Sequence, residues 1–134
     1  MSDRPEVEDV SINKQKGKYL IEIKVKQVSN LEKEFTEINT MIKSTLQDKE
    51  YELKIGDKRN QNLEMVFDNI QIAIYDALDN HKYVWLNEEL GRYIEPRGMT
   101  YKIFIDDQRL YLQINDGQSY LYTIINRTTD QDIV

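Results

Sequence analysis

Three short segments in the last third of the chain constrain the fold more than any other feature, because apolar and polar residues alternate along each of them. The segments cover residues 100–105, 109–114 and 119–126. Alternation with a period of two is typical of strands that bury one face. The Asp116-Gly117 pair between the last two is a strong signal for a tight hairpin turn, as Asp106-Asp107 is for the first connection. The pattern predicts an antiparallel three-stranded meander.

Two more strands and two amphipathic helices are predicted upstream. Residues 18–27 and 51–55 alternate like strands. Apolar residues spaced by three and four predict a first helix, with Ser29 and Glu32 as a capping box at its start. A second helix is predicted over 61–78. Met65, Ile72 and Tyr75 lie beside its main apolar stripe, which indicates a helix buried over a wide arc.

The region that follows is less regular. Residues 83–86 have the composition of a strand, and Asn87 can begin a short helical turn through Tyr93. The elements together predict an α+β fold in which a mostly antiparallel sheet carries two amphipathic helices on one face. We expect a flexible arm over 1–17, a single domain over 18–127 and a frayed tail over 128–134, with 1–12 and 129–134 dispensable for folding.

Composition excludes several classes of protein. The chain has 134 residues, no cysteine and a single histidine. Disulfide frameworks, zinc–cysteine sites and thiol nucleophiles are therefore excluded, and a length of about 100–150 residues is typical of one domain. The start of the chain is polar and acidic and has no signal-peptide pattern, and no apolar run is long enough to span a membrane. We expect a cytoplasmic protein.

Charge is distributed unevenly. The formal net charge is −6, which disfavours a dedicated duplex-DNA binder, whose affinity comes largely from neutralised phosphates. Residues 14–26 nevertheless carry a local charge of +4. Lys24 and Lys26 share the solvated face of the first predicted strand, where they can bind an anion or discourage sheet-to-sheet pairing.

Signatures of catalysis are missing. There is no phosphate-binding glycine loop with a lysine and no nucleophile elbow. The carboxylate pairs Glu88-Glu89 and Asp106-Asp107 fit a helix start and a turn. His81 lies just past a predicted helix end, where a histidine interacts favourably with the last carbonyls. We expect neither an enzyme, a cofactor nor a metal site.

The meander displays the candidate binding residues. With two-residue turns at 106–107 and 116–117, Ile103 pairs with Leu110 and Tyr111 lies opposite Tyr122. One face is then apolar, and the other gathers aromatic and polar side chains: Lys102, Phe104, Arg109, Tyr111, Gln113, Tyr120 and Tyr122. Tyrosine and arginine are enriched at interface hot spots, so this face is the predicted partner-binding surface. Alternatively, Trp85, residues 87–98 or a second copy of the chain covers it.

Arg92 and Arg97 flank a loop with Pro96 and Gly98, where they can hold an anion or a carboxylate of a partner, or pair with acids of this chain. We expect a non-enzymatic binding protein, acting as an adaptor, inhibitor or regulator of a larger protein. A composition rich in Lys, Ile, Asn, Asp and Tyr suggests a bacterial or phage source. The alternative is an RNA or single-stranded nucleic-acid binder that uses the same aromatics with the lysines of 14–26. A homodimer and, least favoured, a metal-dependent hydrolase stay open.

Overall fold

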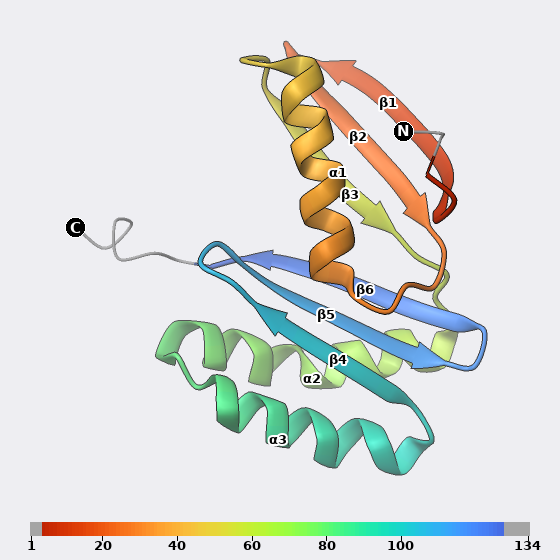
Figure 1. Cartoon of the computed structure of the whole chain (residues 1–134). Helices are drawn as coiled ribbons and strands as arrows, with labels where there is room; N and C mark the ends of the chain where they lie inside the picture. Colours follow the sequence, from red (N-terminus) through yellow and green to blue (C-terminus); the bar gives the residue numbers. More distant parts are fainter. Residues whose placement is uncertain (1–3, 128–134) are drawn as a thin grey trace. The chain divides into compact units, whose positions relative to one another are not determined.

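The computed structural model describes residues 4–127 (Figure 1). They confirm the α+β class, with three α-helices and two three-stranded sheets in the described part of the chain. The chain forms two compact units, and the boundary between them lies between Asp57 and Lys58. This boundary falls inside the range 18–127 for which the sequence predicts a single domain. The predicted tail over 128–134 lies outside the described residues.

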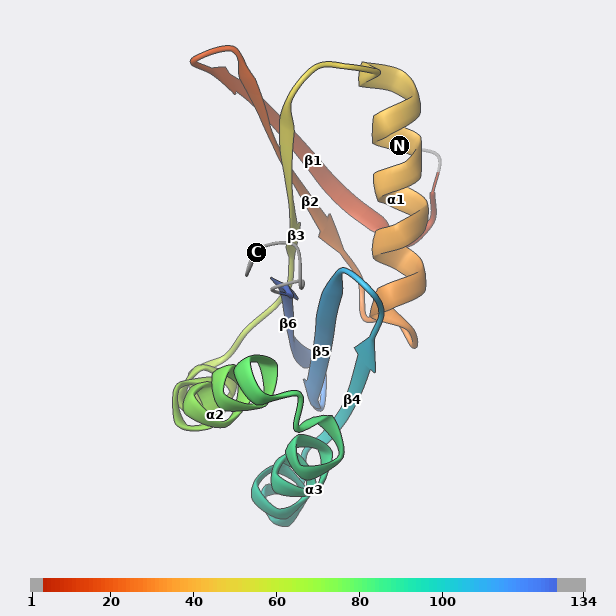
Figure 2. The same cartoon turned by 90° about the vertical axis from the view of Figure 1, so that its left-hand side faces the viewer.

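The first unit combines one sheet with one helix. Its strands are β1 (Val7–Gln15), β2 (Lys18–Val25) and β3 (Tyr51–Gly56), in the order β1-β2-β3. β1 and β2 form an antiparallel hairpin, and β3 runs parallel to β2 after the helix α1 (Leu31–Leu46). Figure 2 shows α1 on one side of these strands. The buried residues of the unit come from β2, α1 and β3: Ile21, Ile23, Val25, Leu31, Phe35, Ile38, Ile42 and Ile55.

The predicted flexible arm over 1–17 is wrong for residues 7–15, which form β1. This strand pairs along its length with β2, and Ile12 lies opposite Ile21. Most of its side chains are exposed, so little apolar alternation marks it in the sequence. Hydrogen bonds to β2, rather than a buried face of its own, hold the segment in place.

The start of α1 also differs by one residue from the prediction. Asn30, not Ser29, is the N-cap, and its side-chain oxygen accepts a hydrogen bond from the backbone N–H of Lys33 at 2.9 Å. Both residue types satisfy the unpaired N–H groups of a first turn, which is why composition alone does not separate them.

The second unit contains the predicted meander. Its helices are α2 (Gln61–Asn80) and α3 (Tyr83–Ile94), followed by the short 3-10 helix η1 (Glu95–Arg97). Its strands are β4 (Thr100–Ile105), β5 (Arg109–Asp116) and β6 (Ser119–Asn126), antiparallel in the order β4-β5-β6. The expected strand at 83–86 is wrong, because that segment is the first turn of α3. Leu86, Leu90 and Ile94, spaced by four, are all buried on one side of that helix.

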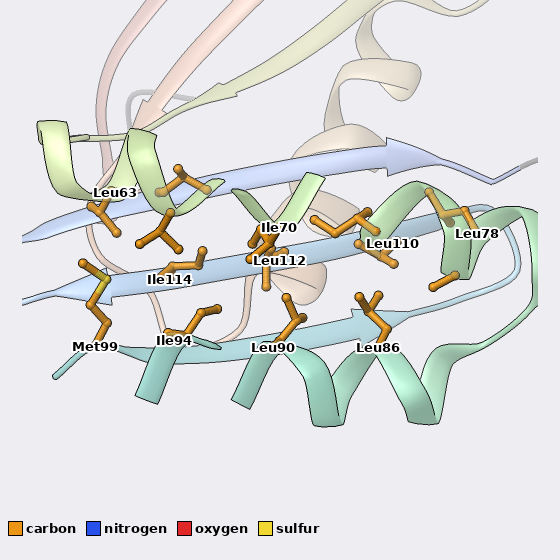
Figure 3. Close-up of a cluster of buried hydrophobic side chains, with 14 residues drawn as sticks. Leu63, Ile70, Leu78, Leu86, Leu90, Ile94, Met99, Leu110, Leu112 and Ile114 are labelled. Atoms are coloured by element: carbon orange, nitrogen blue, oxygen red, sulfur yellow. The ribbon is translucent and has the colours of Figure 1, made fainter. Parts of the chain in front are cut away.

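One face of this sheet and the two helices enclose the core of the unit. Figure 3 shows side chains of α2 and α3 meeting those of β5. Fourteen buried residues form the cluster, among them Ile70 and Ile74 of α2, Leu90 of α3 and Leu112 of β5. The sequence predicts one sheet with two amphipathic helices on one face. The structure has two sheets: α2 and α3 pack on this one, and α1 belongs to the unit of the other.

The register within the meander differs from the prediction by one residue at each turn. Ile103 pairs with Leu112 instead of Leu110, and Tyr111 lies opposite Ile124 instead of Tyr122. The turns are centred on 107–108 and 117–118, and Gly117 has a φ of 65°. Because each turn moves by one residue, every pairing moves by two, and each side chain keeps the face that was predicted for it.

Candidate protein-binding surface

The seven residues predicted to form a binding face do share one face of the second sheet. Lys102 pairs with Gln113, Phe104 with Tyr111, and Gln113 with Tyr122. The opposite face carries Leu110, Leu112 and Ile114, which belong to the core under α2 and α3. Trp85 and residues 87–98 therefore lie on the core side of the sheet and do not cover the aromatic face.

The aromatic face is largely inaccessible. Tyr111, Gln113, Tyr120 and Tyr122 are buried, Phe104 and Arg109 are half-buried, and Lys102 is exposed. A side chain without accessible surface contributes to binding only after a rearrangement. The face that the sequence predicts as a partner surface is thus not open in this conformation.

Tyr111 and Asp106 form a specific contact at the turn between β4 and β5. The Tyr111 hydroxyl donates to Asp106 Oδ2 at 2.7 Å, and Asp106 Oδ1 accepts the N–H groups of Gln108 and Arg109. Burial, followed by the hydrogen bond to Asp106, raises the pKa of Tyr111 to about 12. Burial opposes ionisation of Asp106, but these hydrogen bonds outweigh it and lower the pKa of this carboxyl. Asp106 therefore organises the turn, as predicted for a turn residue.

The two predicted arginines interact with their own helical segment. Arg92 pairs with Glu89 at 3.0 Å, one helical turn away. The guanidinium of Arg97 lies 3.8 Å from the centroid of the Tyr93 ring and donates to the Tyr93 carbonyl. Arg92 therefore pairs with an acid of this chain, as one of the predicted alternatives has it, whereas Arg97 contacts Tyr93. Lys24 and Lys26 are exposed at the end of β2 in the other unit.

The outer side of α2 differs from the prediction. Met65, Ile72 and Tyr75 were predicted to widen the buried arc, but Met65 and Tyr75 are about half exposed and Ile72 is 82% exposed. The core stripe of the same helix is separate and contains Leu63, Val66, Ile70, Ile74 and Ala77. At 100° per residue, Ile72 lies almost directly opposite Ile70.

Two aspartates interleave with these exposed apolar residues. Met65, Asp68, Ile72, Tyr75 and Asp79 follow one another at spacings of three and four, and we call them the α2 ridge. Residues at these spacings lie in a continuous row along one side of a helix. The signal was therefore present in the sequence, as a second stripe half a turn away from the core stripe.

The surface around the α2 ridge is acidic. α2 contains Glu64, Asp68, Asp76 and Asp79 and no lysine or arginine. Two cations flank the helix. Lys82 pairs with Asp76 at 3.6 Å and lies 5.6 Å from the centroid of the Trp85 ring, and the guanidinium of Arg59 lies 5.7 Å from the centroid of the Phe67 ring of α2. Next to Trp85, Val84 is 77% exposed at the start of α3. Exposed apolar residues thus continue past the end of α2 into the first turn of α3.

The described residues contain no cluster of three or more acidic or histidine side chains suited to hold a metal ion. Within the same residues, no helix is long and apolar enough to cross a membrane. No family model, curated protein or solved structure matches this chain. We therefore infer the function from the surfaces of this chain.

Proposed function

We propose that this chain is a non-enzymatic protein-binding domain that contacts its partner through the α2 ridge. The observation that carries the proposal is the exposure of Ile72, at 82%, within a row that also contains Met65 and Tyr75. A single exposed apolar residue is ordinary, but three of them in one row along a helix, with Asp68 between Met65 and Ile72, form a patch of apolar and acidic residues. Such patches are characteristic of interaction sites.

The spacing of the α2 ridge favours a helical partner. Alternating intervals of three and four residues are those of the a and d positions in a coiled coil, where side chains of one helix insert between those of another. Asp68 and Asp79 occupy two positions of this row. Polar residues at such positions reduce the stability of the complex but select its register and partner, so they favour specific over nonspecific association.

Charge defines the chemistry of the partner. α2 contains four acids and no lysine or arginine, and one of the acids, Asp76, is paired with Lys82. The other three, Glu64, Asp68 and Asp79, favour a helix with an apolar stripe flanked by lysine or arginine. Two copies of α2 packed against each other would place like charges together. The acidic ridge therefore disfavours a homodimer through this surface and supports a basic partner.

The alternative function, binding of RNA or single-stranded nucleic acid, has less support. It requires rings that stack on bases, and Tyr111, Tyr120 and Tyr122 are buried. The lysines of 14–26 lie in the first unit, and Lys18 there is paired with Glu52 at 3.8 Å. Within the first unit the half-buried ring of Tyr19 lies 5.4 Å from the Lys14 ammonium group, but the row of aromatics predicted to stack on bases belongs to the second unit.

Affinity capture from extracts of the native host tests the proposal. The test variant is Ile72→Asp with Tyr75→Ser, and the matched control is Asn62→Asp with Gln71→Ser, at exposed positions on the flanks of the same helix. We expect both variants to keep the wild-type melting temperature, because no core residue changes. The ridge variant should lose the captured protein, whereas the control should retain it.

Two further measurements distinguish protein binding from nucleic-acid binding. Nuclease treatment should leave the captured protein in place, and its loss would support the nucleic-acid function instead. Raising salt from about 50 to 200 mM costs a phosphate-binding protein orders of magnitude in affinity, whereas an interface with an apolar centre weakens far less. Equal capture by the ridge variant and the wild type would show that the α2 ridge is not the binding surface.

A further inference from the structure

A second binding feature lies in the first unit and is independent of the α2 ridge. β1 is at the edge of its sheet, with β2 as its one strand neighbour among the described residues (Figure 1). An edge strand presents a row of backbone N–H and C=O groups on its outer side. β1 is nine residues long and contains no proline, so this row can pair with an added strand.

An apolar groove lies directly beside this edge. It has a volume of about 270 Å³ and is lined by Val10 and Ile12 of β1, Tyr19 and Ile21 of β2, and Met41 and Leu46 of α1. Ile12 is 60% exposed although it points to the same face of the sheet as the buried Ile21. The groove thus lies between an edge strand and a helix and has an accessible apolar floor.

The two ends of the groove differ in charge. At the Tyr19 end, the ammonium groups of Lys14 and Lys49 lie 5.4 and 5.9 Å from the centroid of the Tyr19 ring. Within residues 4–127, neither lysine forms an ion pair with a carboxylate. An anionic group of a ligand would find two cations there.

At the other end, the cation is already neutralised. Arg4 Nη2 lies 3.1 Å from Glu34 and 2.9 Å from Glu37, and Arg4 Nη1 is 4.0 Å from Met41 Sδ. This difference gives the groove a direction, because Lys14 and Lys49 can bind an anionic group beside Tyr19, whereas Arg4 at the other end is already paired with Glu34 and Glu37.

We propose that an extended peptide segment of a partner protein adds to β1 as an antiparallel fourth strand. Its inward side chains alternate, so that two apolar residues lie over Val10 and Ile12 and an acidic residue reaches Lys14 and Lys49. Antiparallel pairing is the more stable arrangement per residue, and the period of two places every second side chain in the groove. Backbone pairing supplies affinity, and the groove supplies specificity.

A designed peptide tests this proposal without knowledge of the natural partner. The probe is acetyl-Thr-Glu-Thr-Val-Thr-Val-Lys-amide, whose glutamate faces Lys14 and whose valines face Ile12 and Val10 when it pairs antiparallel with 15–9. Binding to the full chain is measured by isothermal titration calorimetry. Two further peptides carry N-methyl groups on alternate sets of amides, one set donating to β1 and the other pointing away. We expect saturable binding of the probe and of one methylated peptide, and loss of binding for the other.

Three variants of the full chain locate the site. Ile12→Asp should weaken binding by about tenfold or more, because it places a charge on the groove floor, and an exposed position should tolerate it without loss of folding. Lys14→Glu should weaken binding of the probe and strengthen binding of a peptide in which lysine replaces the glutamate. Lys24→Glu is the matched control, since it makes the same change on the opposite face of the sheet and should leave both affinities unchanged.

Several outcomes would overturn the proposal. They are the absence of saturable binding, equal binding by both methylated peptides, and an equal effect of Lys14→Glu and Lys24→Glu. A wild-type dimer that Ile12→Asp converts to a monomer would show that a second copy occupies the groove. None of these results bears on the α2 ridge, because it lies in the other unit.

Discussion

Ile70 and Ile72 are two residues apart on α2 but face opposite directions, since Ile70 is 4% exposed and Ile72 is 82% exposed. Ile70→Ala should therefore reduce the free energy of unfolding by about 2–5 kcal/mol, the usual cost of truncating a large core residue. Ile72→Ala should change it by less than about 0.5 kcal/mol, as surface substitutions do. Urea denaturation of the two variants measures both values. Equal losses would show that both sides of α2 are buried, which is what the sequence alone predicted.

Tyr111 gives the protein a specific response to alkaline pH. Its pKa is raised to about 12 in the folded chain, against about 10 for an unperturbed tyrosine. A raised folded-state pKa contributes stability that is complete below about pH 10 and is lost as the pH rises through about 12. Tyr111→Phe removes this titration and the 2.7 Å hydrogen bond to Asp106. We expect the variant to be less stable at pH 8 and to lose less stability than the wild type between about pH 10 and 12. An equal fall of the melting temperature of both proteins across this pH range would contradict the assignment.

At the scale of elements, the sequence predicted the strands and helices that have a strong period and missed those that do not. The meander and α2 were recognised because alternation and 3.6-residue spacing repeat in them many times. β1 was missed because its partner, not its own apolar face, orders it. The pattern predicts a strand at the first turn of α3 because Tyr83, Val84 and Trp85 favour strands locally. The burial of Leu86, Leu90 and Ile94 overrides this preference.

The pairing of β1 with β2 reverses one expectation about truncation. If residues 1–17 were a flexible arm, removal of 1–12 would not change stability. Because Val10 and Ile12 of β1 pair with Ile23 and Ile21, we expect the deletion to reduce the free energy of unfolding. Deleting 1–12 should lower the melting temperature, by roughly 2–8 °C for each kcal/mol lost, because the shift is larger when a smaller part of the chain unfolds cooperatively. Arg4→Gln separates the contribution of the Arg4 ion pairs from that of the strand. An unchanged melting temperature after the deletion would mean that β1 is not stably paired in solution.

At the scale of the whole molecule, the division into two units has a measurable consequence. Each unit has its own buried residues, with Ile38 fully buried in the first and Ile74 fully buried in the second. Native-state hydrogen exchange reports the local opening of each region. Ile38→Ala should reduce amide protection more within 4–57, and Ile74→Ala more within 58–127. If both variants lower protection equally in both ranges, the chain unfolds as the single domain that its sequence predicts.

In the candidate site, too, sequence alternation determines the face on which a side chain lies, and tertiary packing determines whether that face is accessible. Alternation correctly placed Tyr111, Gln113 and Tyr122 on one face of the sheet, because a face depends only on the parity of the register. Whether that face is open depends on tertiary packing, which the pattern does not encode, and the three side chains are buried. The α2 ridge can be recognised in the sequence as a second stripe of the helix. Both stripes contain large apolar residues, so tertiary packing determines which one forms the core.

Photo-crosslinking from position 72 tests the central claim, that the α2 ridge is a protein-binding surface, most directly. A benzophenone amino acid replaces Ile72 in the full chain in native host cells, and Gln71 is replaced in the control. We expect one nuclease-resistant protein adduct from position 72 that is lost when Asp68→Lys and Asp79→Lys are added, with little adduct from position 71. The absence of a protein adduct at position 72, or equal adducts at both positions, would contradict it.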